Sequence, residues 1–144
     1  MAGNGASADA ISVLESRGLD LSSHRSRPLA IEELDSADLI VAMTSAHVRE
    51  ILALSPRVEH KVRLLKELEK LVQERAAETS SERLAGMLAV ARPRRRRALD
   101  VDDPMGLPIS TYERCVSELE TGIRALADVL CGPISGEGVD LDGS

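Results

Sequence analysis

The chain of 144 residues contains no phenylalanine and no tryptophan, and Tyr112 is its only tyrosine. Proteins that bind single-stranded nucleic acids usually stack the bases on aromatic side chains, so this absence disfavours that class of function. The hydrophobic core must instead be built from Leu, Ile, Val, Met and Ala. A chain of this length is enough to bury one such core in one domain.

The chain also lacks any apolar run close to the roughly 20 residues that span a bilayer. No basic stretch followed by an apolar stretch opens it, as a secretory signal peptide would. The formal net charge of −6 disfavours nucleic acid and anionic membranes as partners. We therefore expect a cytoplasmic protein that binds neither nucleic acid nor membrane.

Histidine and cysteine are too few and too widely spaced for a metal site. His24, His47 and His60 show no His-x-x-x-His pattern, and no cysteine pair lies near them. We predict no metal and no cofactor.

The only two cysteines, Cys115 and Cys131, are interpreted as reduced structural thiols. In one helix they would lie about 24 Å apart, which is too far for a disulfide. Neither has an arginine six residues later, where Thr121 and Glu137 stand instead. Neither begins a loop that leads into a helix N-terminus, the position that lowers a thiol pKa and binds phosphate.

A short apolar run is the strongest structural signal that the sequence does contain. Residues 38–43 lead from Asp38 into five apolar residues, which is typical of a parallel strand buried on both faces. Residues 61–65 predict a second strand. Two strands alone make a marginal sheet. The sequence therefore predicts an incomplete α/β fold with few parallel strands.

Helical patterns account for most of the remaining residues. Ser7 and Ser45 are predicted N-caps, and Thr79 with Glu82 forms a capping box. A long helix follows Ser110, and we expect its apolar stripe to pack along the core. That stripe comprises Tyr112, Val116, Leu119, Ile123, Leu126 and Leu130. The basic run 92–97 is interpreted as a solvated linker, and 132–144 as a flexible tail.

The turn Asp102-Asp103-Pro104 is the clearest candidate for chemistry. Adjacent carboxylates raise one another's pKa, and proline fixes the backbone that presents them, which suits a general acid. The same residues also fit an acidic turn before a capped helix. Spacing alone leaves both interpretations open.

In this order the segments resemble the low-molecular-weight protein tyrosine phosphatase family over residues 6–130. The matching segments are Ala6-Ser7, Arg17-Gly18-Leu19-Asp20-Leu21-Ser22-Ser23-His24-Arg25-Ser26-Arg27, Ala37 to Thr44 with His47, Lys61 to Leu65, and Asp103-Pro104-Met105-Gly106 with Tyr112. The resemblance implies a flavodoxin-like three-layer α/β fold with four parallel strands. It also implies hydrolysis of a phosphate monoester through a phospho-cysteine intermediate, with Asp103 as the general acid and Met105 at the substrate entrance.

The resemblance also implies parts that this sequence does not contain. The family's first strand, its Cys-x5-Arg-Ser phosphate loop, its first helix and its second strand have no counterpart here. We therefore expect residues 1–131 to be a truncated phosphatase-like domain with a helical insert at about 66–97 and no turnover of its own. With the missing loop, its partner would be a phosphorylated protein or a small phosphate monoester. The alternative is a non-catalytic binding or regulatory module that pairs with another chain or with itself through an open sheet edge.

Overall fold

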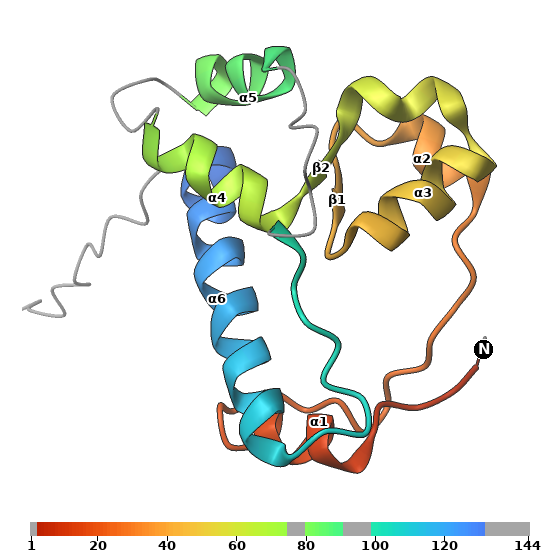
Figure 1. The fold of residues 1–144 in the computed structure, drawn as a ribbon, viewed down its shortest axis with the longest axis vertical. Coiled ribbons are helices and arrows are strands. Elements are labelled where there is room, and N and C mark those ends of the chain that lie inside the picture. The colour runs from red at the N-terminus through yellow and green to blue at the C-terminus, as the bar shows by residue number, and fades with distance from the viewer. Residues whose placement is uncertain (1–2, 75–79, 91–98, 132–144) are drawn as a thin grey trace, which may run out of the picture.

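The structure is a computed structural model that describes residues 3–74, 80–90 and 99–131 (Figure 1). The basic run 92–97, Thr79 and the tail 132–144 lie outside these residues. The elements in chain order are α1 (Ala8–Glu15), α2 (Ile31–Ser36), β1 (Ile40–Ala42), α3 (Ser45–Leu54), the 3-10 helix η1 (Pro56–Lys61), β2 (Val62–Leu64), α4 (Leu65–Glu74), α5 (Ser80–Ala89) and α6 (Ile109–Cys131).

Strands β1 and β2 form a parallel pair in which Ile40 is opposite Val62 and Ala42 is opposite Leu64. Both lie inside the predicted ranges 38–43 and 61–65, so the expected α/β class with few parallel strands is confirmed. Because the pair is parallel, the carboxyl ends of the two strands meet at the same end of the sheet.

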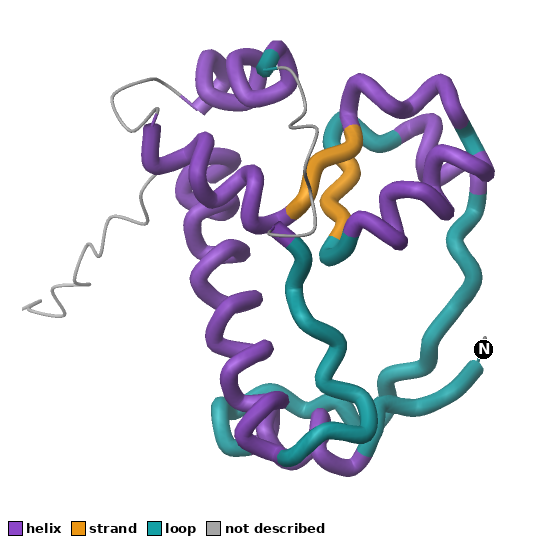
Figure 2. The backbone as a smooth tube through the Cα atoms, in the orientation of Figure 1, coloured by secondary structure: helices purple, strands orange, loops and turns teal. Residues whose placement is uncertain are grey.

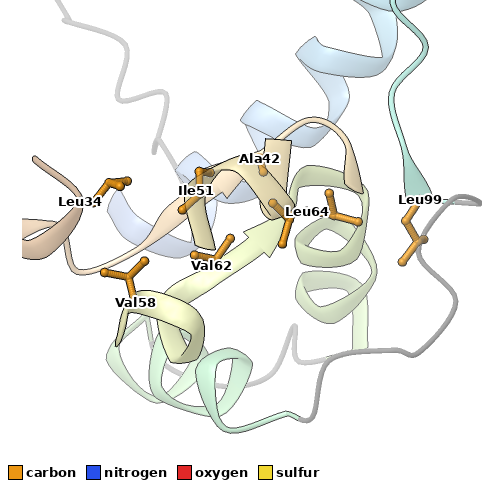
Figure 3. Packing of buried hydrophobic residues seen from close by; sticks show 8 residues of the cluster. Leu34, Ala42, Ile51, Val58, Val62, Leu64 and Leu99 are labelled. Carbon is orange, nitrogen blue, oxygen red and sulfur yellow. The ribbon is translucent and has the colours of Figure 1, made fainter. Parts of the chain in front are cut away.

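The two faces of the strand pair contact different groups of helices, which gives three layers. On one face Ala42, Val62 and Leu64 pack with residues of α2, α3 and η1 (Figure 3). On the other face Leu39 and Val41 pack against a cluster from α4, α5 and α6. The alternation follows the two-residue period of a strand. Figure 1 shows the strands between these two groups.

Helix α1 lies away from the sheet and packs on α6 (Figure 2). Ser7 caps α1 as predicted, because its hydroxyl oxygen accepts the N–H of Ala10. The same hydroxyl donates to the phenol oxygen of buried Tyr112 at 3.3 Å. Arg17 adds an ion pair to Glu120 at 2.5 Å. These contacts fix α1 to the first half of α6.

Two predictions about helix detail were wrong. Thr44 caps α3, and the predicted cap Ser45 is the first helical residue. In α6 the buried seam includes Cys115, whereas Ile123 and Leu130 of the predicted stripe are 54% and 51% exposed. The expectation that the whole stripe packs along the core therefore fails at these two residues.

None of the helices among the described residues is both long and apolar enough to cross a membrane.

Candidate active site

The loop between α5 and α6 brings Asp103 to the carboxyl end of β1. The N–H of Val101 donates to the carbonyl oxygen of Met43, directly after β1, at 2.9 Å. Two residues further on, exposed Asp103 accepts the N–H of Met105 on its Oδ1 at 3.0 Å. Gly106 has a φ of +77°, which only glycine adopts without strain, and this lets the chain turn back towards α6.

Asp100 fixes the same loop to the start of α3. Its Oδ1 accepts both the backbone N–H and the hydroxyl of Ser45, each at 2.7 Å. Its carbonyl oxygen accepts the Lys66 ammonium of α4 at 3.0 Å. The role of Asp100 was not predicted from the sequence. Its partner Ser45 is 55 residues away, and no local sequence pattern indicates such a contact.

A hollow of about 540 Å³ lies where these elements meet, and we call it the acidic hollow. It is lined by the end of β1, the start of α3, the loop 100–104, and Cys115 and Leu119 of α6. The loop contributes Asp100, Asp102 and Asp103. Among the described residues no cationic side chain forms an ion pair with any of these carboxylates. The described lining of the hollow therefore carries three carboxylates.

The pKa of the Cys115 thiol is raised in this hollow. Burial raises its pKa, and the charges of Glu118, Asp103 and Asp102 raise it further against the opposing charge of Lys66. This fits the interpretation of Cys115 as a structural thiol, since a nucleophilic cysteine needs a lowered pKa. Cys131 is exposed at the end of α6.

The other predicted residues are only partly brought together. Exposed His47 lines the acidic hollow, whereas His24 and His60 do not. Met105 is 75% exposed beyond the acidic hollow, beside exposed Leu107. Within the described part of the chain, no group of three or more His, Cys, Asp or Glu side chains is placed to hold a metal ion.

Comparison with known proteins matches this chain to phosphatases, both by a family model and by an individual relative. A family model described as low molecular weight phosphotyrosine protein phosphatase matches residues 1–81. A protein-arginine-phosphatase of Geobacillus stearothermophilus is 31% identical over 128 residues, which cover 89% of this chain and 69% of that protein.

Solved structures agree with these sequence matches. The YwlE arginine phosphatase from Geobacillus stearothermophilus matches with a TM-score of 0.65 and 30% identity, over 91% of this chain and 68% of that one. A low molecular weight protein tyrosine phosphatase from T. tengcongensis matches with a TM-score of 0.64 and 28% identity, over 88% and 69%. The expected flavodoxin-like arrangement is confirmed by these likenesses.

Proposed function

The chain belongs to the low molecular weight phosphotyrosine protein phosphatase family, and from this premise we propose that its acidic hollow is the proton-donating half of a phosphatase site. In this proposal Asp103 is the general acid. It protonates the leaving atom of the substrate as the phosphoryl group passes to the thiolate of the nucleophilic cysteine that the resemblance implies. Its carboxylate then accepts a proton from the water that hydrolyses the phospho-cysteine.

The position of Asp103 carries this proposal. The carboxyl end of a parallel strand is where open α/β sheets bind their ligands. Asp103 lies there on a loop held by the Val101 backbone contact and by the Asp100 contacts to α3. A general acid needs such a fixed backbone, because proton transfer requires hydrogen-bond reach to the leaving atom.

The 144 residues by themselves are proposed to be inactive. A phosphoryl group carries negative charge, and carboxylates repel it unless cations and backbone N–H groups hold it. The described residues of the acidic hollow provide no arginine, and neither cysteine is followed by an arginine six residues later. Turnover therefore requires an added element that carries the nucleophile and positive charge.

Phosphoarginine is the substrate class that we propose for the completed site. Its guanidinium leaving group is attracted by the acidic hollow, whereas the ring of a phosphotyrosine would have little aromatic surface to stack on. The chain has no Phe or Trp, and Tyr112 is buried against Ser7. The Geobacillus relative named protein-arginine-phosphatase supports the same choice.

The resemblance implies a strand, a Cys-x5-Arg loop, a helix and a second strand ahead of the matched region, and the test uses a fusion protein in which this segment is taken from the Geobacillus relative and precedes Met1. Asp103→Asn should lower turnover of phenyl phosphate, a poor leaving group, by about 10²–10⁴-fold. Turnover of p-nitrophenyl phosphate should change far less, because a good leaving group needs little protonation. Asp102→Asn is the matched control. Equal losses on both substrates would remove Asp103 from the acid role, and turnover by the unfused 144 residues would refute their inactivity.

The second candidate function is a non-catalytic module that binds another chain. Among the described residues β1 pairs with β2 alone, and the free hydrogen-bonding side of this strand favours the second candidate. A folded chain that binds no polypeptide would argue against it.

A further inference from the structure

The loop that carries Asp103 is joined to the carboxyl ends of both strands through one peptide group. The N–H of that group belongs to Val101 and donates to the carbonyl oxygen of Met43, the residue after β1, at 2.9 Å. Its carbonyl oxygen belongs to Asp100 and accepts the ammonium of Lys66, two residues after the end of β2, at 3.0 Å. Because the N–H and C=O of a trans peptide point in opposite directions, the group is held from both sides.

Beyond this peptide, the loop makes its hydrogen bonds locally. Among the described residues, the hydrogen bonds of the segment 102–108 stay within that segment or reach the first turn of α6. Val101 is buried, whereas Asp102 and Asp103 are exposed. On its N-terminal side, Asp103 therefore depends on the Asp100–Val101 peptide for its place.

Lys66 makes a second contact that fixes its own position. Its Nζ lies 2.8 Å from Oε2 of Glu118 on α6, and the two side chains are 28% and 34% exposed. An ion pair with this much exposure contributes little to stability by itself. We therefore interpret the pair as orienting the ammonium towards the Asp100 carbonyl oxygen, so that α4, α6 and the loop meet at one group.

The same contacts argue against a direct role of Lys66 in binding phosphate. Lys66 is not one of the residues that line the acidic hollow. Its ammonium is already bound to a carbonyl oxygen and to a carboxylate. A lysine that held a phosphoryl group would direct its donors into the hollow instead.

We propose that Lys66 is a positioning residue for Asp103, because it fixes the carbonyl side of the peptide from which the acid loop extends. The contact of Ser45 with the Asp100 side chain leaves that carbonyl unsupported. The proposal rests on the proposed function, in which Asp103 donates a proton. A misplacement of about 1 Å can cost about 10²-fold in rate, since the acid must reach the leaving atom.

The test compares two leaving groups in the fusion protein. Lys66→Met should lower kcat for phenyl phosphate by about 10- to 100-fold and kcat for p-nitrophenyl phosphate by less than about threefold, with KM nearly unchanged. Lys66→Arg should restore most of the phenyl phosphate rate, because a guanidinium can donate to both acceptors. Partial unfolding lowers both rates equally, so equal losses on the two substrates would overturn the proposal.

A double-mutant cycle tests whether Lys66 acts through Asp103. In an Asp103→Asn background, Lys66→Met should cause no further loss on phenyl phosphate, because no acid is left to position. Losses that multiply would show that Lys66 acts by another route and would overturn the proposal. Lys70→Met is the matched control, since Lys70 is an exposed lysine one turn later on α4, and it should change neither rate.

Hydrogen exchange on the 144-residue chain measures the contact itself. In Lys66→Met the Val101 amide should exchange at least about tenfold faster, whereas the amides in the middle of α3 should not change. Lys66→Gln is the second variant in case Lys66→Met does not fold. Its neutral side chain is one bond shorter and cannot reach both acceptors, so it should show the same effects. Unchanged exchange at Val101 in a folded variant would overturn the proposal.

The positioning role and the proposed function fail in different ways. If Asp103→Asn lowers turnover of both substrates equally, the general-acid role is refuted, and Lys66 has no acid to position. If Asp103→Asn is selective for phenyl phosphate and Lys66→Met is not, the proposed function stands and the positioning role is overturned.

Discussion

The two cysteines share α6 but differ in their surroundings. Cys115 is buried beside acidic side chains that raise its pKa, while Cys131 is exposed. Because the thiolate is the reactive form, iodoacetamide at about pH 8 should alkylate Cys131 at least about tenfold faster than Cys115. Peptide mass spectrometry over time measures both rates, and unfolding in urea should make them similar. Comparable rates in the native chain would show that the Cys115 thiolate is accessible.

Single residues also show how much of the site is readable from the sequence. Asp103 was predicted as the acid from its turn and from the resemblance, and the structure places it at the carboxyl end of a strand. Its catalytic role stays a prediction. Asp100 was missed, because its function is to bond Ser45 across 55 residues. Local patterns identify turns and caps, but not which distant backbone groups a side chain reaches.

At the scale of elements, Arg63 fixes α5 to the sheet. Its side chain is 2% exposed, and one nitrogen donates to the carbonyl oxygens of Leu88 and Val90, at 2.6 and 3.3 Å, at the end of α5. Glu67, also buried, lies 3.9 Å away. A cation at the C-terminal end of a helix also complements the helix dipole. The buried guanidinium therefore holds α5 in place.

Arg63→Met should lower the free energy of unfolding by about 3–5 kcal/mol, because it removes the cation beside the buried Glu67 carboxylate. Hydrogen exchange in α5 should accelerate. Arg124→Met is the control, since among the described residues that exposed arginine forms an ion pair with exposed Glu120 alone, and its loss should cost under about 0.5 kcal/mol. Chemical denaturation measures both, and a small effect of Arg63→Met would show that α5 is held by apolar contacts alone.

The crossing of α4 and α6 depends on Gly122. A Cβ atom added at this position would lie 2.7 Å from Cγ of Leu65, which is buried and cannot move freely. Gly122→Ala should therefore destabilise the chain by about 1–2 kcal/mol, although alanine is the better helix former. In a Leu65→Ala background the same change should become neutral or stabilising. Urea denaturation of the four variants tests this, and an additive result would mean that the two residues do not collide.

Helix limits were more predictable than helix orientation. Ser7 and the Ser55-Pro56 stop are local signals, and both mark helix ends in the structure. The face that α6 buries depends on which elements pack against it, and this information is not local. Ile123 is exposed although its spacing fits the apolar stripe. Apolar periodicity identifies a helix but does not say whether its partner is part of the described chain.

At the scale of the whole molecule, every residue of β2 is buried, whereas Ile40 and Val41 of β1 are half-buried and, among the described residues, β1 pairs with β2 alone. The chain covers 69% of the Geobacillus protein that it resembles. Val41 and Ala42 of β1 line a mainly apolar surface hollow together with Ile51 and Leu54 of α3.

The pH dependence of stability follows from groups distributed over the whole chain. Hydrogen bonds lower the pKa values of four carboxylates. Asp20 and Asp35 fall below the ordinary value of 3.8, chiefly through Ser22 and Arg57 respectively. Glu33 and Glu120 fall below 4.5, chiefly through Arg27 and Arg124 respectively. The stabilisation from these carboxylates is present above about pH 4.5 and is lost as the pH falls through their folded-state values. The pKa of Cys115 is raised above 9.0, so its contribution is present below that pH and is lost as the pH rises through the folded-state value.

We therefore expect the urea midpoint to be nearly constant between about pH 5 and 8 and to fall on both sides. Asp35→Asn should reduce the slope of the acid side, because Asp35 no longer exchanges a proton on unfolding. Cys115→Ala should make the urea midpoint fall less steeply above pH 8, because the variant has no thiol at this position to lose a proton. Each substitution serves as the control for the other. High salt should weaken the acid-side dependence, since the carboxylates and their arginine partners are solvent-accessible. If the urea midpoint of Asp35→Asn fell with decreasing pH as steeply as that of the wild type, the loss of stability in acid would belong to other carboxylates.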